Sequence, residues 1–482
     1  MAWTSTRGHG RTPRGRAVFA AGVLGLGLGL APLGAADGAQ IYVFVRRTGC
    51  SDSGHGTSAL PYCTIVKAAK AATAGQIVVV YAGTYTGEVF PWHSGTSTAR
   101  ITFRPVTGNA VIISGARHGF TISNHSWITV SGFKIQNSTS NGIYVSNATG
   151  VNLTGNTVQT SGRRVSGAGA YGMYLNAMKS SVVRGNKVLN NSGSGIFVTN
   201  GSTGNQLVGN EIAYNAYGYV RNAVGIDLRA PANLIIGNRI HHNEDSGIQM
   251  FAGGDRNRII NNVVYANKGF TTAAMSNCAH PPTGNTAGCI TGDHGIDSSG
   301  TTGGWIIGNT VYGNATAGIN LEGLPAGTNS GYRIVNNIAV DNAVNCPNGA
   351  GGVVKCPRNA GNVRVDKNSV LGTVLDYDLV NLSTAGTMMV WGSTSYSSLA
   401  AMKAASGQDA HGRQADPRFV NAAGGVFTLR AGSPAIDSAN SSAPGQATTD
   451  AASHRRVDDP ATANTGAGVR AYDDRGAYEF QP

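Results

Sequence analysis

The chain has 482 residues, of which 41% are hydrophobic, 12% are charged and 69 are glycine. This composition supplies a core and has no long apolar stretch after the N-terminal segment, which excludes a disordered chain, a coiled coil and a multispanning membrane protein. The formal net charge of +12 predisposes the protein toward polyanions. Because no basic run with interleaved aromatic residues occurs, an acidic polysaccharide is favoured over nucleic acid as the partner.

Residues 1–36 have the three parts of a secretory signal peptide. The basic part contains Arg7, Arg11, Arg14 and Arg16. An apolar run follows from about Ala17 to Leu33, and small residues occupy positions 34–36. An uncleaved membrane anchor is the alternative. We expect a secreted, extracellular monomer with no membrane segment after signal cleavage.

The six cysteines form three sequence-local pairs, and short closures together with an export signal favour disulfides between neighbours. The pairs are Cys50 with Cys63, Cys278 with Cys289, and Cys346 with Cys356. Disulfides agree with an oxidising, extracellular setting. Zinc binding is disfavoured because no CxxC pair occurs.

Residues 37–116 differ in composition from the rest and are expected to begin and cap a solenoid, whose first coil otherwise exposes core and unpaired strand edges. A strand-like run starts at Ile41, and a short helix is expected from Thr64 to Ala72. The apolar stripe predicted for this helix consists of Ile65, Val66, Ala69 and Ala72.

Residues 117–380 contain a repeat in which a glycine is followed by an aliphatic residue, a variable residue and, usually, another aliphatic residue. Its glycines are Gly142, Gly172, Gly195, Gly225, Gly247, Gly295 and Gly318. The unit is about 22 residues long, with insertions, and holds short β-like triplets separated by glycine and asparagine. A solenoid of short strands is therefore expected.

Two kinds of residue recur in register within this repeat. The inward aliphatic column is Ile143, Met173, Ile196, Ile226, Ile248, Ile296 and Ile319. The asparagine columns are Asn156, Asn186, Asn210, Asn238, Asn262, Asn309 and Asn337, and then Asn191, Asn215, Asn243, Asn267, Asn314 and Asn342. Asparagine tolerates left-handed turn geometry and can hydrogen-bond to the next coil. The pattern predicts an all-β, parallel β-helix, to which the usual chirality of parallel connections assigns a right hand.

Residues 381–482 lose the repeat and are expected to form a β-rich C-terminal cap. They carry the runs that begin at Asp416, Gly432 and Asp474, which resemble the closing region of many secreted bacterial β-helix proteins. We therefore expect a cap here and no second catalytic domain.

Aromatic residues give way to charged residues midway along one outward face. The first outward position is Tyr144, Tyr174, Phe197, Asp227, Gln249, Asp297 and Asn320, and the next is Ser146, Asn176, Thr199, Arg229, Phe251, Ser299 and Glu322. Two further carboxylates, Asp245 and Asp293, each precede a repeat glycine by two residues. Coils lie about 4.8 Å apart, so these carboxylates would repel unless a cation, an arginine or shared protons intervened. A solvated acidic face is the alternative.

All three long insertions lie between the asparagine column and the glycine, and are expected to build walls beside this face. They span Gly162–Tyr171, Ala216–Val224 and Lys268–His294. Basic and aromatic residues there suit an acidic sugar chain. The substrate-binding candidates are Arg163, Arg164, Tyr174, Tyr217, Arg221 and Asn320.

The N-terminal run from Tyr62 through Ile77 and Tyr85 to Arg104 resembles the corresponding module of family 9 pectate lyases and chondroitinase B-like enzymes. The segment Asp293-His294-Gly295-Ile296-Asp297 is similar to the calcium-binding segment of family 9 lyases. This resemblance implies that Asp293 and Asp297 bind Ca²⁺, with Asp245 or Asp227 from neighbouring turns. The chain departs from the family at Asn320, where the family has a lysine base, and at His294, which replaces a carboxylate.

The resemblance implies calcium-assisted β-elimination, in which a cation or Arg229 neutralises a uronate carboxylate and a base removes the C5 proton. His294 and Lys268 are the candidate bases. In the alternative reading, a glycoside hydrolase, Asp227, Asp297 and Glu322 perform acid and base chemistry. A noncatalytic carbohydrate-binding surface protein is the third alternative.

Overall fold

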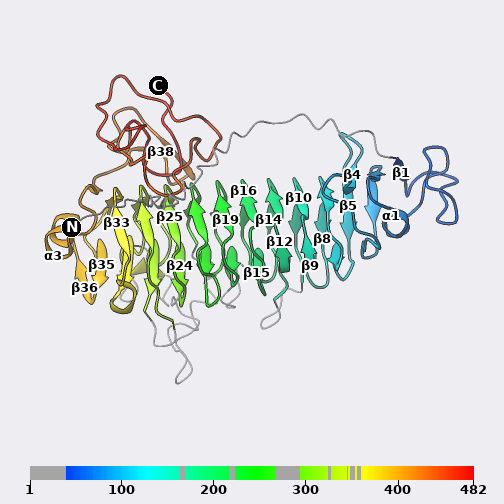
Figure 1. Cartoon of the computed structure of the whole chain (residues 1–482), viewed down its shortest axis with the longest axis horizontal. Helices are drawn as coiled ribbons and strands as arrows, with labels where there is room; N and C mark the ends of the chain where they lie inside the picture. The colour runs from blue at the N-terminus through cyan, green and yellow to red at the C-terminus, as the bar shows by residue number, and fades with distance from the viewer. Residues whose placement is uncertain are drawn as a thin grey trace, which may run out of the picture. The chain divides into compact units, whose positions relative to one another are not determined.

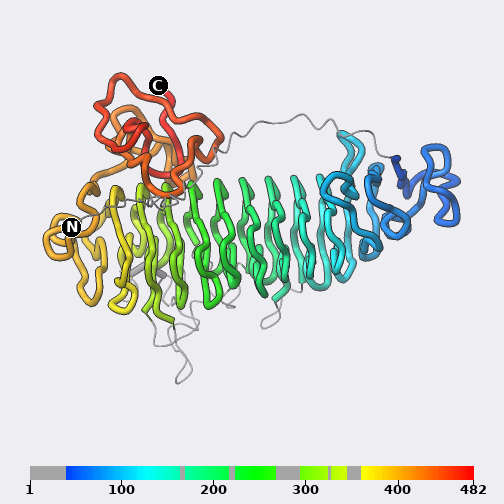
Figure 2. The backbone as a smooth tube through the Cα atoms, viewed as in Figure 1, coloured from blue at the N-terminus to red at the C-terminus, as the bar shows by residue number. Residues whose placement is uncertain are grey.

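The computed structural model describes residues 39–162, 169–216, 223–267, 294–323, 327–344, 346–347, 353–354 and 360–482. These residues form a β-helix of three parallel sheets with two short α-helices (Figure 1). Successive coils lie side by side in chain order, as the backbone tube shows (Figure 2). The predicted parallel β-helix is therefore confirmed, whereas the predicted signal peptide lies outside the described residues.

From β6 (Phe120–Ser123) to β34 (Leu379–Asn381) each coil contributes one strand to each sheet, in the order C, A, B, whereas the strands before β6 belong to sheets A and B. Sheet A contains β1 (Gln40–Val43), β2 (Ile77–Val80), β4 (Ile101–Pro105), β7 (Ile128–Ser131), β10 (Asn152–Thr154), β13 (Val182–Arg184), β16 (Gln206–Val208), β19 (Leu234–Ile236), β22 (Arg258–Ile260), β25 (Trp305–Ile307), β28 (Arg333–Val335) and β33 (Val374–Asp376). Sheet B contains β3 (Gly83–Tyr85), β5 (Val111–Ser114), β8 (Lys134–Gln136), β11 (Thr157–Gln159), β14 (Lys187–Leu189), β17 (Glu211–Ala213), β20 (Arg239–His241), β23 (Val263–Tyr265), β26 (Thr310–Tyr312), β29 (Ile338–Val340), β34 (Leu379–Asn381) and β37 (Arg413–Gln414).

Sheet C carries the outward face singled out in the sequence. It contains β6 (Phe120–Ser123), β9 (Ile143–Thr149), β12 (Met173–Lys179), β15 (Ile196–Thr199), β18 (Ile226–Leu228), β21 (Ile248–Met250), β24 (Ile296–Ser299), β27 (Ile319–Glu322), β32 (Val363–Asp366), β35 (Met389–Gly392) and β36 (Thr394–Tyr396). The β35–β36 pair is antiparallel and the other pairs of this sheet are parallel. The three insertions join sheet B to sheet C, since they precede β12, β18 and β24.

The repeat glycines allow close approach between coils. A Cβ atom on Gly225 would lie 2.5 Å from the carbonyl oxygen of Gly247 and 2.6 Å from Cγ2 of Ile240. Only a residue without a side chain fits this space. The aliphatic residue that follows each glycine, such as Ile226, points inward and is fully buried, as predicted.

The asparagine columns form continuous hydrogen-bond ladders between coils. In the first ladder, the backbone N and the Nδ2 of Asn238 both donate to Oδ1 of Asn262, at 2.9 Å each. Asn262 repeats the same two bonds to Asn309, at 2.8 and 3.0 Å. The second ladder continues one rung beyond its predicted end, to Asn362. The repetition of buried amide hydrogen bonds fixes the register of the coils that the ladders join.

The first ladder ends on two buried carboxyl groups that the sequence pattern did not reveal. Asn337 donates to Oδ1 of Asp378 from both its backbone N and its Nδ2, and the backbone N of Asp378 donates to Oδ1 of Asp409. Burial raises the pKa of Asp409 to about 7. Burial and the charge of Asp409 raise the pKa of Asp378 as well. The pair therefore keeps a proton at pH values at which exposed carboxyl groups are already ionised.

The N-terminal end is capped by α1 (Ile65–Ala71), one residue shorter at each end than predicted. Thr64 is its N-cap and accepts a hydrogen bond from the backbone N of Lys67. Ala68 is fully buried whereas Val66 is half-buried, so the stripe differs from the prediction at one position. The predicted Cys50–Cys63 disulfide is present. The side chains of Cys278, Cys289, Cys346 and Cys356 lie outside the described part of the chain.

The C-terminal region closes the end of the β-helix and also covers sheet B. Leu399 and Met402 of α3 (Leu399–Ser406) join the main core. The hairpin of β38 (Phe419–Asn421) and β39 (Val426–Leu429) then packs on the outer face of sheet B, where Phe427 contacts Tyr265. Arg475 donates to the carbonyl oxygen of Asp378. Beyond β39 the region is irregular, so it is less β-rich than expected.

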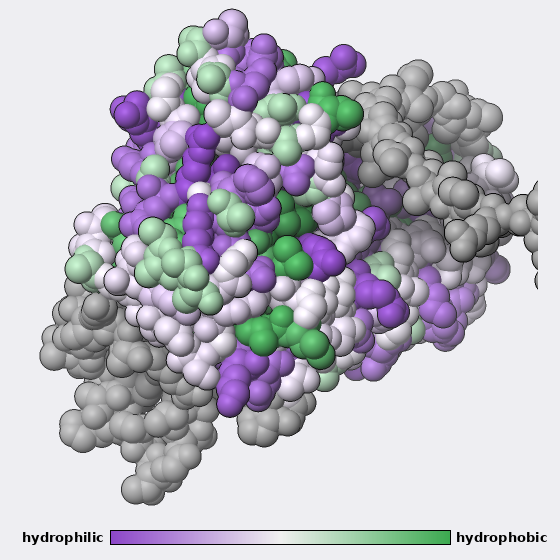
Figure 3. All heavy atoms as spheres, turned by 60° about the vertical axis from the view of Figure 1, so that its left-hand side comes forward, coloured by the Kyte–Doolittle hydropathy of each residue, from purple (hydrophilic) through white to green (hydrophobic). Residues whose placement is uncertain are grey.

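Three short elements complete the description: η1 (Lys367–Ser369) and the antiparallel pair β30 (Cys346–Pro347) and β31 (Val353–Val354). Among the described residues, no helix is long and apolar enough to cross a membrane. On the face seen in Figure 3, apolar residues form small patches among polar ones.

Replacing the terminal carboxyl of the ladder should change the pH dependence of stability. Between the ordinary carboxyl pKa and about 7, folded Asp409 binds a proton that the unfolded chain releases, so stability falls as pH rises through this interval. Asp409→Asn keeps the acceptor oxygen, and asparagine tolerates the φ of 54° at this position. We expect the variant to be more stable at pH 7 by on the order of 1–3 kcal/mol, with a flatter pH profile. Urea unfolding from pH 4 to 8 measures this, and an unchanged profile would contradict it.

Candidate functional site

The first outward row of sheet C is in register, as predicted. Tyr144 pairs with Tyr174, Tyr174 with Phe197, and Phe197 with Asp227. The row continues through Gln249, Asp297 and Asn320 to Arg364. Aromatic side chains therefore occupy the N-terminal coils of this face, and carboxyl and amide side chains occupy the coils that follow.

Arg229 is held at the boundary between these two parts. Its guanidinium lies 5.4 Å from the ring centre of Phe197 and 5.3 Å from that of Phe251, one coil to either side. Its Nη2 is 3.1 Å from Oδ2 of Asp227, and its Nε donates to both oxygens of that carboxylate at 3.2 Å. The Arg229 side chain is nevertheless 45% exposed. The result is a cation with a fixed position and a free edge toward solvent.

The rings form a continuous stack that leads to this cation. His118 stacks on Tyr144 with ring centres 5.2 Å apart, Tyr144 lies 5.4 Å from Tyr174, and Tyr174 stacks on Phe197 at 5.3 Å. Tyr171 also packs on Phe197, at 4.8 Å. The rings of Tyr174 and Phe197 are parallel to within 6°, whereas those of Tyr144 and Tyr174 are tilted by 51°.

Beyond Arg229, a buried polar group surrounds Asp297. Asn320 Nδ2 donates to Oδ1 of Asp297 at 2.8 Å, and Gln249 Nε2 donates to Oδ2 at 3.3 Å. His294 Nε2 lies 3.2 Å from Asn320 Nδ2, and its Nδ1 lies 2.7 Å from Oγ1 of Thr316. A neutral His294 with its proton on Nδ1 satisfies both contacts. His294 is almost fully buried, so as a base it would act inside this network.

Three buried carboxyls lie on neighbouring coils. Burial raises the pKa of Asp297 to about 6, against the hydrogen bonds from Asn320 and Gln249. Burial and the charge of Asp297 raise the pKa of Asp245 to about 7, although Ser246 donates to it. Burial also raises the pKa of Asp227, which Arg229 opposes. If all three carboxyls were ionised, they would repel one another, so a cation or a bound proton is needed to compensate their charge.

The other predicted site residues divide into two groups. Glu322 lies in β27, half-buried and in register with Ser299 of β24. The remainder lie outside the described residues: Arg163, Arg164, Tyr217, Arg221, Lys268 and Asp293. The structure thus brings together Asp227, Arg229, His294, Asp297 and Asn320, and places Asp245 beside them.

A hollow of about 450 Å³ lies at the N-terminal end of the same face. It is lined by Glu88, Arg117, His118, Thr121, Ser140, Asn141, Tyr144 and Tyr174. Sequence reasoning found only the two tyrosines. The missed signal is Gly119-Phe-Thr-Ile, an earlier copy of the repeat. His118 directly precedes its glycine, as His294 precedes Gly295, and Arg117 lies two residues before the glycine, as Asp245 does before Gly247.

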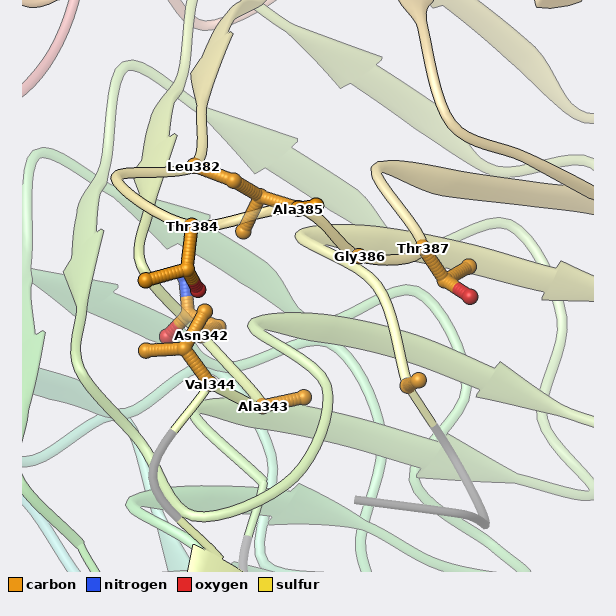
Figure 4. Close-up of a pocket in the computed structure, with 9 residues that line it drawn as sticks. Asn342, Ala343, Val344, Leu382, Thr384, Ala385, Gly386 and Thr387 are labelled. Carbon is orange, nitrogen blue, oxygen red and sulfur yellow. The ribbon is translucent and has the colours of Figure 1, made fainter. Parts of the chain in front are cut away.

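A second cavity, of about 60 Å³, lies between the loops that follow β29 and β34 (Figure 4). Leu382, Thr384 and Ala385 face Asn342 and Val344 across it. Its lining contains no titratable side chain. It therefore offers no acid, base or cation for chemistry, and the sheet C face remains the candidate site.

Comparisons with known sequences agree with this architecture. The family model described as "Right handed beta helix region" matches residues 160–302, in agreement with the predicted hand. The model described as "Periplasmic copper-binding protein (NosD)" matches residues 93–224. A curated relative, the uncharacterized protein YwoF of Bacillus subtilis (strain 168), is 34% identical over 125 residues. That match covers 23% of this chain and 26% of the relative.

Several solved structures share this fold at low sequence identity. Pectate lyase Pel9A aligns with a TM-score of 0.54 and 14% identity, covering 93% of this chain and 98% of that one. XylC in complex with xylose aligns with a TM-score of 0.51 and 14% identity, covering 71% and 75%. The Dettilon tailspike protein aligns with a TM-score of 0.50 and 16% identity, covering 78% and 69%. The protein is a right-handed parallel β-helix.

The two rings beside Arg229 should contribute unequally to stability. Phe197→Leu removes ring contacts with Tyr174, Tyr171 and Arg229, and should destabilise the fold by about 1–3 kcal/mol. Phe251 is 38% exposed and its recorded ring contact is with Arg229, so Phe251→Leu should change stability by less than about 1 kcal/mol. Urea unfolding of the matched pair measures the difference, and equal effects would argue against a continuous stack.

Proposed function

We propose that this protein is a secreted polysaccharide lyase that cleaves a uronate-containing polysaccharide by β-elimination. The observation that carries the proposal is Arg229, a half-exposed guanidinium fixed by Asp227 and two rings beside a row of buried carboxyls. A planar guanidinium with free N–H groups matches a uronate carboxylate. The net charge of +12 supports attraction of an anionic polymer.

In this mechanism the residues of sheet C neutralise the substrate and move its proton. Arg229 pairs with the uronate carboxylate and makes the C5 proton more acidic. A base takes that proton, the electron pair forms the C4–C5 double bond, and the bond from C4 to the glycosidic oxygen breaks. The leaving oxygen takes a proton from solvent water. His294 and Lys268 are the proposed bases, and in His294 the atom that would take the proton is Nε2, which lies 3.2 Å from Asn320 Nδ2.

A calcium ion is proposed as a partner of the carboxyl group cluster. Asp245, Asp297 and Asn320 offer hard oxygen ligands, and Oδ1 of Asn320 is buried without a hydrogen-bond partner. Among the described residues no group of three or more His, Cys, Asp and Glu side chains is arranged around a metal position, and Asp293 lies outside those residues. When bound, calcium would supply a second positive charge for the uronate carboxylate.

A glycoside hydrolase is the second candidate, favoured by the spacing of two carboxyls. Asp227 in β18 and Asp297 in β24 are in register two coils apart, which corresponds to about 10 Å between the strands. This is near the carboxyl separation of inverting glycosidases, about 6.5–9.5 Å. In that case Asp227 or Glu322 would partner Asp297. A noncatalytic sugar-binding protein remains a possible outcome of the assay below.

An extracytoplasmic location is proposed on two grounds. The Cys50–Cys63 disulfide is expected to persist in an oxidising compartment. The family model that matches residues 93–224 describes a periplasmic protein. The predicted signal peptide over residues 1–36 agrees with both.

The lyase proposal predicts an unsaturated product. Incubation with uronate polymers should raise absorbance near ~235 nm in step with reducing ends, because elimination creates a conjugated double bond. Arg229→Ala should lower kcat/KM by about 100-fold or more, whereas Arg184→Ala, an exposed arginine on sheet A, should not. Reducing ends without absorbance would favour hydrolysis, and neither signal would favour a noncatalytic protein.

Calcium binding is tested separately from activity. If Asp297 is a ligand, CaCl₂ should raise the Tm of the wild-type protein by roughly 2–4 °C, because ligand binding to the folded state stabilises it. Asp297→Asn should reduce that shift, and MgCl₂ at the same concentration serves as the ion control. A wild-type Tm unaffected by calcium, or an equal shift in the variant, would reject the proposed site.

A further inference from the structure

The hollow at the N-terminal end of sheet C lies on the same face as Arg229. Thr121 of β6 and Tyr144 of β9 line it, and Tyr144 precedes Arg229 by three coils, which is about 14 Å along the sheet. Its volume of about 450 Å³ lies in the range of ligand-binding pockets. A polymer lying along the face from Arg229 toward the N-terminal coils would therefore reach it.

The polar groups of the hollow include both donors and acceptors of hydrogen bonds. Glu88 accepts a hydrogen bond from Oγ1 of Thr121 and still has acceptor positions, and Arg117 is exposed with its donors. His118 uses Nδ1 toward the carbonyl oxygen of Asn141, at 3.2 Å. The phenol groups of Tyr144 and Tyr174 also line the hollow. This set suits a ligand rich in hydroxyl groups, each of which can donate and accept.

The charges of the hollow do not favour an anion. Arg117 and Glu88 carry opposite charges, and burial lowers the pKa of His118, which keeps the imidazole neutral near pH 7. A uronate in the hollow would meet the carboxylate of Glu88 as well as the guanidinium of Arg117. A neutral sugar unit meets no such repulsion.

In the part of the chain that the structure describes, the two outward rows between the hollow and Arg229 are uncharged, and the exposed Lys179 lies beyond them at the end of β12. On β9, β12 and β15 the two outward rows carry Tyr144, Tyr174 and Phe197, and then Ser146, Asn176 and Thr199. Carboxylates of consecutive uronate units would find no cation in these rows, whereas hydroxyl groups can bond to the serine, asparagine and threonine side chains. In the second of these rows, the position after β18 holds the cation Arg229.

We infer that the hollow is a subsite for a neutral sugar unit, so that the polymer bound on sheet C is a heteropolysaccharide in which a uronate at Arg229 is followed, toward the N-terminal coils, by neutral sugars. The inference rests on the proposed function and narrows its substrate class. It distinguishes mixed polymers from homopolymers of uronate, whose carboxylates would occupy every position.

The test compares two polymers and a matched pair of variants. Deacylated gellan, in which neutral sugars separate the glucuronate units, serves as the mixed polymer, and polygalacturonate serves as the homopolymer. Affinity is measured by affinity electrophoresis with the full mature protein. We expect gellan to bind more tightly than polygalacturonate, and Tyr144→Phe to weaken gellan binding by about 2–10-fold through loss of one hydrogen bond. Tyr81→Phe is the control, since Tyr81 also stacks on a ring, Phe44, but lies outside sheet C.

Glu88→Gln adds a second readout that a general folding defect would not produce. Removal of the negative charge should strengthen polygalacturonate binding while leaving gellan binding within about 3-fold, because only the uronate polymer is repelled. Equal affinity for both polymers with no effect of Tyr144→Phe, while Arg229→Ala abolishes binding, would reject the subsite and keep the proposed function. Absence of binding and cleavage of both polymers by the wild-type protein would reject the proposed function together with the subsite.

Discussion

The hydrogen bonds between buried asparagine side chains are the constraint on which the structure depends. Each rung accepts two bonds from the coil before it and donates two to the coil after it, so a coil cannot slip without leaving buried amide groups unpaired. A slip of one residue would also turn every strand inside out. Because the register is fixed in this way, side chains on separate coils, such as Phe197, Arg229 and Phe251, meet at constant spacing.

Sheets B and C have different uses because their outer faces have different neighbours. The C-terminal hairpin contacts sheet B through Tyr265, and Arg475 reaches the carbonyl of Asp378 at the end of that sheet. Sheet C instead carries the ring stack, the cation and the buried carboxyls. Asp297 is buried and accepts a hydrogen bond from the side-chain amide of Asn320, whereas Arg229 remains half-exposed. The face thus combines a rigid interior with an accessible cation at Arg229.

Periodicity made the fold and the register readable from the sequence, since every coil repeats the same glycine, aliphatic and asparagine positions. The row from Tyr144 to Asn320 was predicted for the same reason. Periodicity does not predict the contacts between individual side chains. The stacking of Tyr174 on Phe197, and the burial of His294 between Thr316 and Asn320, depend on neighbours on adjacent coils. The hollow was missed because Gly119 repeats the motif before its most regular copies begin. Asp378 and Asp409 were missed because they replace asparagine in the ladder.

Because the coils are stacked at a constant spacing, the distance between two positions on sheet C follows from the number of coils between them. The separation between the hollow and Arg229 is a whole number of strand spacings, since each intervening coil adds about 4.8 Å and nothing smaller is possible without breaking the ladders. Duplication or loss of one coil would lengthen or shorten the face by that step and leave each neighbouring coil intact. A relative with one more coil between these two positions would bind a longer stretch of polymer, with the same residues at the hollow and at Arg229. The number of coils therefore sets the distance between the two positions in steps of one strand spacing.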